Sequence, residues 1–232
     1  MAKRHYWLIV DTETSIDDHV ADFGAIVVDR KGTVYKQCAV MVQGIFGKES
    51  LFFDRNASGL WAQSSVERRT QAYTDMLNAG TRMLASVGAI NRWLERAKGE
   101  FDPELTAYNL AFDKSKCRNT QIDLGIFKSE FCLWQASVGN VCNTKGFKNF
   151  ILQNHRFNVP TDKGNMSFKT DAETVCGYIK GEFIEEPHTA LEDAKDFELP
   201  ILTHILAKKE WRNKITPYDW NAHQVKDHFG VK

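Results

Sequence analysis

Residues Tyr6 to Val10 form a continuous apolar run of aromatic and branched side chains that ends directly at Asp11. A run that is apolar at every position predicts a strand buried on both faces. Strand-like runs follow at 23–29 and 33–42, and the short connection between them, which contains a glycine, predicts a hairpin. The chain is therefore expected to begin as a three-stranded antiparallel meander with layers packed on both of its faces.

After residue 64 the pattern becomes helical. Met83, Val87, Ile90 and Leu94 recur at intervals of three and four, which predicts one buried helix face, and Gly99 is the expected stop. After residue 99, the fold class is inferred from the order of the predicted elements rather than from their exact ends. Strands are predicted at 105–108 and 130–134, and helices at 145–155, near 171 and after 189, whereas residues 44–64 and 159–165 are expected to be irregular. Strands followed by alternating strands and helices indicate a mixed-sheet α/β domain.

Composition excludes some classes of function. The chain has 232 residues, 43% of them hydrophobic, which is enough for one large domain with a short appendage. Lys and Arg number 30, as do Asp and Glu, so nucleic-acid binding would depend on local patches or metal ions rather than on an overall positive field. The apolar run before Asp11 is too short for a signal-peptide core or a membrane span. A cytoplasmic location without a membrane partner is expected.

The cysteines are odd in number and scattered, and no two of them form a C-x-x-C pair: Cys38, Cys117, Cys132, Cys142 and Cys176. Reduced thiols are therefore expected. A zinc site formed by Cys132, Cys142 and His155 fits no common ligand spacing. We favour small buried hydrophobic side chains as the role of these cysteines.

Acidic residues stand at the end of the first predicted strand. Asp11 and Glu13 are two positions apart, so on a strand they point to the same side. Two carboxylates there can form a site for a hard cation. Taken alone, such a pair is more often a solvated strand end or a helix cap.

A second segment combines His188 with Asp193. Thr189 and Glu192 have the spacing of a capping box, which predicts a helix that starts at Ala190 and leaves His188 in the preceding loop. From there, the histidine and Asp193 can face one cavity. Viewed singly, they are equally compatible with an exposed loop histidine and an acid that stabilises a helix N-terminus.

A third segment lies between them in the sequence. Asn109 ends the predicted strand at 105–108, and Asp113 follows Phe112, which either contacts a ligand or belongs to the core. A turn-forming Asn and a solvated Asp are the alternative interpretation. A small basic cluster comes next, formed by Lys114, Lys116 and Arg118. It is either a solvated helix face or, beside an acidic metal centre, a site for a phosphate backbone.

The three segments together resemble the motifs of the DEDDh (DnaQ-like) 3′→5′ exonuclease family of the RNase H-like superfamily. D-x-E stands at 11–13, N-x-x-F-D at 109–113 and H-x-A-x-x-D at 188–193. The resemblance extends over roughly residues 6 to 207. The sequence departs from the family pattern in three ways: the usual Gly after the first motif is absent, Asp22 stands where a longer acid is common, and the stretch from 44 to 80 is longer than usual.

The resemblance implies an RNase H-like five-stranded mixed sheet, three antiparallel strands followed by two parallel ones, flanked by helices. It also implies a two-metal phosphodiester hydrolase that uses Mg²⁺ or Mn²⁺. Asp11 would bridge both ions, Glu13 and Asp193 would complete one site, and Asp113 would hold the other ion directly or through water. His188 would be the general base.

By the same resemblance, the substrate is the 3′ end of a single strand, from which nucleoside monophosphates are released. The backbone around Thr12 and Thr14 and the side chains of Ile16, Asn109 and Phe112 would contact the terminal nucleotides. DNA is favoured over RNA, because no side chain is evidently committed to the 2′-hydroxyl group.

Two alternatives remain open. One is an exoribonuclease that trims small RNAs or RNA 3′ ends, and the other is a polymerase-associated or nucleic-acid-binding scaffold subunit. We expect residues 1–208 to form the exonuclease domain and residues 209–232 to form a C-terminal extension. The extension is expected to dock on the domain through large apolar side chains, namely Trp211, Trp220, Val225 and Phe229.

Overall fold

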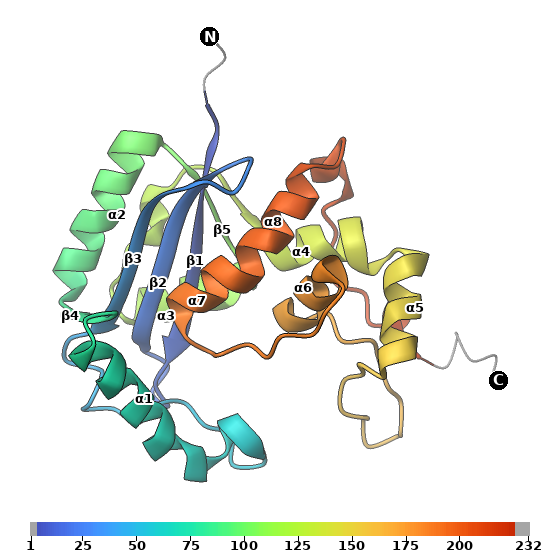
Figure 1. Ribbon diagram of the computed structural model, residues 1–232, viewed down its shortest axis with the longest axis horizontal. Helices are drawn as coiled ribbons and strands as arrows, with labels where there is room; N and C mark the ends of the chain where they lie inside the picture. Colours follow the sequence, from blue (N-terminus) through green and yellow to red (C-terminus); the bar gives the residue numbers. More distant parts are fainter. Residues whose placement is uncertain (1–3, 226–232) are drawn as a thin grey trace.

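The computed structural model describes residues 4–225, which form a mixed sheet with the strand order β4-β3-β2-β1-β5-β6 (Figure 1). The strands are β1 (Tyr6–Thr14), β2 (Val20–Asp29), β3 (Val34–Val42), β4 (Met83–Ala85), β5 (Glu104–Ala107) and β6 (Glu130–Cys132). β1, β2 and β3 are antiparallel neighbours, β5 is parallel to β1, and β6 is parallel to β5. This confirms the predicted RNase H-like arrangement of three antiparallel and two parallel strands. β4, which pairs in parallel with β3, is an additional edge strand.

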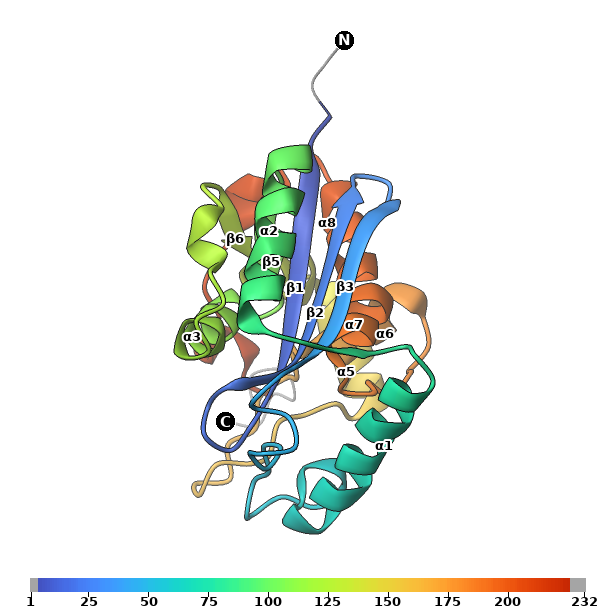
Figure 2. The same ribbon diagram turned by 90° about the vertical axis from the view of Figure 1, so that its left-hand side faces the viewer.

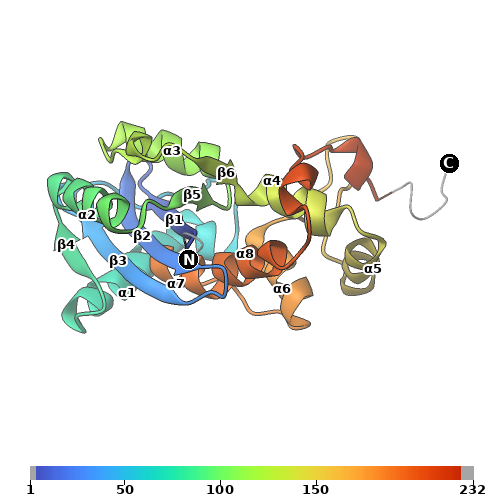
Figure 3. The ribbon, with the colours of Figure 1, turned by 90° about the horizontal axis from the view of Figure 1, so that it is seen from above.

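Helices cover both faces of the sheet (Figures 2 and 3). They are α1 (Val66–Asn78), α2 (Val87–Phe101), α3 (Leu110–Asn119), α4 (Leu133–Ser137), α5 (Lys145–Asn154), α6 (Ala172–Lys180), α7 (Ala190–Asp193) and α8 (Leu199–Leu206). Leu8 and Val10 of β1 belong to the core shared with α2 and α3, whereas Trp7 and Ile9 belong to the core shared with α4 to α8. The first apolar run is therefore buried on both faces, as predicted.

The region between α1 and α2 corrects the predicted helix. Met83 lies in β4 and is 66% exposed, so it does not belong to the buried helix face. The chain leaves α1 through Gly80, whose φ of 72° suits glycine, and Ser86 then caps α2 by accepting a backbone N–H in its first turn. α2 continues past Gly99, the predicted stop, and ends where Asp102 adopts a left-handed conformation.

The segment 190–206 is helical throughout, but its middle is a π-helical turn at 194–198 that separates α7 from α8. Pro200 has no N–H to donate to the carbonyl of Asp196, four residues earlier. Lys180 Nζ donates to that carbonyl oxygen instead, at 2.8 Å. The irregular turn is therefore supported from outside the helix.

Part of the C-terminal segment contacts the rest of the chain. The Trp211 ring packs on the ring of a β6 phenylalanine with centroids 5.0 Å apart, Arg212 pairs with the buried Glu104, and Val225 is buried in the core. A domain boundary at residue 208 stays a prediction, and Phe229 lies outside the described residues. In the described part of the chain, no helix is long and apolar enough to cross a membrane.

Candidate active site

The three acidic segments meet at one end of the sheet. β1 carries Asp11 and Glu13 at its C-terminal end, and β5 runs parallel to it, so α3 starts at the same edge. A direct hydrogen bond joins β1 to α3: Thr12 Oγ1 donates to Asp113 Oδ1 at 2.8 Å. The segment that contains His188 and Asp193 leads into α7, which packs on both β1 and β2.

Gly24 lets α7 approach the sheet. It lies opposite Asp11 in the β1–β2 ladder. A Cβ atom at Gly24 would lie only 2.3 Å from the backbone carbon of Ala190, and backbone cannot yield as a flexible side chain does. Because Gly24 has no side chain, the start of α7 can lie directly beside the first motif.

The close approach brings Glu13, His188 and Asp193 together. One ligand atom from each lies within 4.8 Å of the others, which is a spacing compatible with a shared metal ion. Asp11 Oδ2 and Asp193 Oδ1 are buried and have no hydrogen-bond partner among the described residues. Unsatisfied anionic oxygens at such a site fit a divalent cation with oxygen ligands.

Burial dominates the electrostatics of these acids. It raises the pKa of Glu13 to about 8, that of Asp193 to about 10 and that of Asp113 to about 7. The pKa of Asp11 is also raised well above its ordinary value, first by burial and then by the charges of neighbouring carboxylates. Without a cation, the carboxyl groups cannot all be ionised at neutral pH.

Glu198 is a further buried acid that the sequence analysis missed. Glu198 is only 2% exposed. Its Oε1 accepts the backbone N–H of Tyr108 at 3.0 Å, and its Oε2 has no hydrogen-bond partner among the described residues. After burial, the charge of Glu198 is the largest contribution that raises the pKa of Asp11. In an α-helix, Asp193 and Glu198 would diverge by about 140°. The π-helical turn, with its i to i+5 spacing, reduces this divergence.

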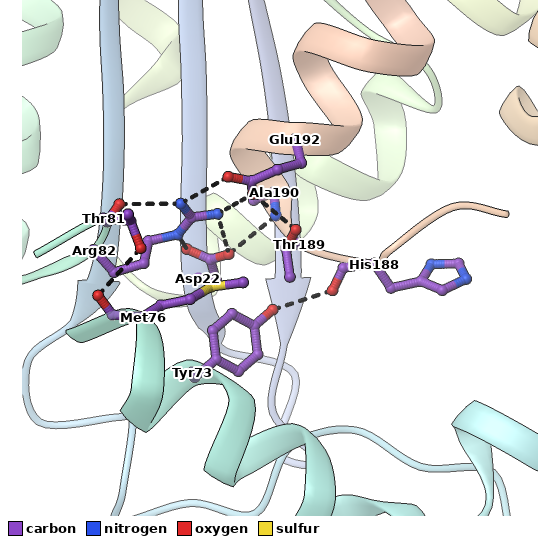
Figure 4. Close-up of polar contacts among 9 residues, drawn as sticks. All are labelled: Asp22, Tyr73, Met76, Thr81, Arg82, His188, Thr189, Ala190 and Glu192. Atoms are coloured by element: carbon purple, nitrogen blue, oxygen red, sulfur yellow. Dashed lines mark hydrogen bonds and ion pairs between the residues drawn. The ribbon is translucent and has the colours of Figure 1, made fainter. Parts of the chain in front are cut away.

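The loop that carries His188 is held by a buried polar network (Figure 4). His188 has a φ of 53°, and its carbonyl oxygen accepts a hydrogen bond from the Tyr73 hydroxyl at 3.2 Å. Asp22 Oδ2 accepts the N–H of Ala190, the first residue of α7, at 3.0 Å. The imidazole itself points away from this network.

Arg82 is the centre of the network. Its Nε donates to Asp22 Oδ1 at 3.2 Å and its Nη1 to Glu192 Oε1 at 3.2 Å, so it joins β2 to α7. The helix starts at Ala190 as predicted, but the predicted capping box is wrong. The Thr189 hydroxyl makes no backbone cap and donates to Glu192 Oε2 at 2.7 Å, because the acid is turned toward Arg82.

The imidazole of His188 packs edge-on against Trp61, with ring centroids 4.6 Å apart. Burial lowers its pKa, which favours the neutral form that can accept a proton. Trp61 ends a short 3₁₀ helix, Gly59–Trp61, within the 44–64 segment that was predicted to be irregular. The guanidinium of Arg69 lies 5.1 Å over the Trp61 ring. The positive charge of Arg69 partly opposes the rise in the pKa of Glu13. Arg69 is therefore a basic group beside the acids, and the sequence analysis did not identify it.

The side chains proposed to contact substrate differ in accessibility. Ile16 and Phe112 are each 41% exposed, whereas Thr14 is buried. Asn109 directly precedes α3. Two members of the basic cluster are already paired with acids, Lys114 with Glu130 and Lys116 with Asp18. This pairing leaves less free positive charge there than the sequence suggests.

Comparisons with known proteins give few matches. No protein-family model matches the chain, and no curated protein matches it. A solved structure of E. coli exonuclease I in complex with a 5cy-dT13 oligonucleotide is similar, with a TM-score of 0.45 and 15% sequence identity. The match covers 88% of this chain and 43% of that chain, so this chain spans less than half the length of the similar protein.

Proposed function

We propose that this chain is a metal-dependent 3′→5′ exonuclease that releases nucleoside monophosphates from single-stranded nucleic acid, with DNA favoured. The observation that carries the proposal is the group formed by Glu13, His188 and Asp193, with unsatisfied carboxylate oxygens buried around it. Buried carboxylates destabilise a fold unless something neutralises them. A site for divalent ions accounts for their retention.

Asp11, Glu13, Asp113 and Asp193 would hold two ions, Mg²⁺ or Mn²⁺. When bound, the ions would neutralise charge on the scissile phosphate and on the leaving oxygen. The raised pKa values support this role, because the burial that raises them, together with repulsion from neighbouring acids at Asp193, would be relieved by a bound cation, which would displace the protons.

His188 is proposed to take a proton from the attacking water. Its position suits that task, because the ring contacts Trp61 and the backbone is fixed by Tyr73. A neutral imidazole is a competent base near neutral pH. The attack at a 3′ terminus, with contacts to Ile16 and Phe112, follows from the resemblance of the motifs to the exonuclease family.

The test uses DNA and RNA strands of one sequence, each labelled at the 5′ end and incubated with Mg²⁺, Mn²⁺ or a chelator. A ladder that shortens from the 3′ end, needs metal and stops at a 3′ phosphate is expected. The Asp193→Asn variant, purified in the same way, controls for a contaminating nuclease. Nicking of closed single-stranded circles would contradict the exonuclease assignment. A rate on RNA more than about tenfold above that on DNA would instead indicate an exoribonuclease, and binding without cleavage would indicate a scaffold.

A further inference from the structure

A pocket of about 490 Å³ opens beside the candidate active site. Its aromatic lining comes from three parts of the chain: Tyr108 follows β5, Trp134 lies in α4, and Tyr218 and Trp220 belong to the C-terminal segment. The sequence analysis assigned none of these side chains to a site. The volume falls in the range of small-ligand pockets.

The pocket is joined to the acidic site through the backbone. The N–H of Tyr108 donates to Glu198, and Asn109, which also lines the pocket, precedes the helix that carries Asp113. A strand whose end lies at the acids can therefore place a neighbouring nucleotide at the pocket.

The aromatic wall is fixed by its own contacts. Trp134 Nε1 donates to Thr170 Oγ1 at 3.0 Å, and the Tyr108 hydroxyl donates to the Thr170 carbonyl at 2.5 Å. Tyr218 stacks with Trp134 and with His223, with centroid distances of 5.4 and 4.8 Å. The Tyr218 ring is therefore held by two other rings, and its hydroxyl is buried without a partner among the described residues.

The lining selects a planar, uncharged ligand. Asn109, Asn158 and Asn165 contribute amide groups, and no lysine or arginine occurs among the described residues that line the pocket. Asp171, which pairs with Lys169 at 3.4 Å, is the charged residue among the described residues of the lining, and a carboxylate disfavours a phosphate. Trp220 is half-buried, lines the pocket and stacks on no other ring among the described residues, which makes it the candidate side chain for stacking a base.

We propose that this pocket receives one unpaired nucleobase of the strand whose 3′ end lies in the acidic site. The inference rests on the proposed nuclease function and deepens it. A base held against Trp220 has left its complementary strand, so the pocket selects single strands over duplexes. The amides of Asn109 and Asn165 can bind the polar edge of the base, whereas the amide nitrogen of Asn158 already donates to Ser167 and to the Phe168 carbonyl.

The test measures binding apart from cleavage. In an Asp193→Asn background with Mg²⁺, fluorescence anisotropy gives the Kd for a labelled oligothymidylate of about ten nucleotides. Adding Trp220→Ala is expected to weaken binding about tenfold, since base–aromatic stacking has this magnitude. Trp220→Leu serves as a second variant that keeps apolar volume. Tyr35→Ala is the control, because Tyr35 packs on Tyr6 at the opposite end of β1 and is expected to change Kd less than about twofold.

Oligonucleotides with a single abasic site, moved through the positions near the 3′ end, locate the bound base. At one position, the proteins with and without Trp220 are expected to bind equally. Equal binding of the intact oligonucleotide by both proteins, or a difference that survives abasic substitution at every position, would overturn the proposal, as would absence of binding. If the Trp220 effect holds while the wild-type protein cleaves no strand, the pocket stands and the proposed nuclease function fails.

Discussion

Arg82→Met tests how much the buried network that holds the His188 loop contributes to stability. Arg82 and Asp22 have fully buried side chains, and their nitrogen and oxygen atoms lie 3.2 Å apart. Removing the guanidinium leaves Asp22 buried with only the N–H of Ala190 as its partner. Breaking a buried ion pair in this way costs about 3–5 kcal/mol. Glu192 is 34% exposed, so its share of the network contributes no more than about 1 kcal/mol.

The measurement is equilibrium urea denaturation at pH 7 with a chelator present, read by circular dichroism. Asp22→Asn, Arg82→Met and the double variant form a thermodynamic cycle, in which the double variant is expected to be more stable than the sum of the single losses predicts by about 2 kcal/mol. Glu192→Gln is the matched control. A loss below about 1 kcal/mol for Arg82→Met, or an additive cycle, would refute the reasoning.

Three further predictions concern the acidic site. His188→Ala is expected to lower kcat about a hundredfold or more and to remove the acidic limb of the pH–rate profile, while calorimetry still detects metal binding; an unchanged limb would mean that another group is the base. Since the pKa values of Asp113, about 7, and Asp193, about 10, lie above the ordinary 3.8, the folded state binds more protons than the unfolded state. The metal-free Tm should therefore fall as pH rises from about 4 through about 7 and onward, and Mg²⁺ should flatten that slope; a Tm that rises with pH would contradict this. Glu198→Gln should raise the metal-free Tm at pH 8 and reduce the shift that Mg²⁺ produces, whereas the exposed Glu95→Gln should do neither.

The central strands could be predicted because their signals are local. The apolar run at 6–10 and the two-residue spacing of Asp11 and Glu13 depend only on strand geometry. β4 could not be predicted in this way, because a three-residue edge strand with an exposed Met83 has no periodic signal of its own. The four-residue spacing between Met83 and Val87 matched a helical repeat by coincidence.

The residues of the site that the sequence analysis missed are brought there by tertiary structure. Glu198 lies near the acids through a π-helical turn, which a pattern based on 3.6 residues per turn does not anticipate. Arg82 and Asp22 are sixty residues apart, and their pairing arises because Arg82 directly precedes β4, which is paired with β3, while Asp22 lies in the adjacent strand β2. Partners that are so far apart in the sequence have no characteristic spacing by which the pair could be recognised.

The two sides of α7 are electrostatically different, and this difference has a functional consequence. On one side, Asp22 and Glu192 are neutralised by Arg82, so the first turn of α7 is held without any metal ion. On the other side, Asp193 retains an oxygen without a partner among the described residues. The loop of His188 is fixed by the neutralised side, through Tyr73 and the N–H of Ala190. It follows that the proposed ions would not have to order the histidine, so the free energy of binding them would be available to offset the repulsion among the buried acids.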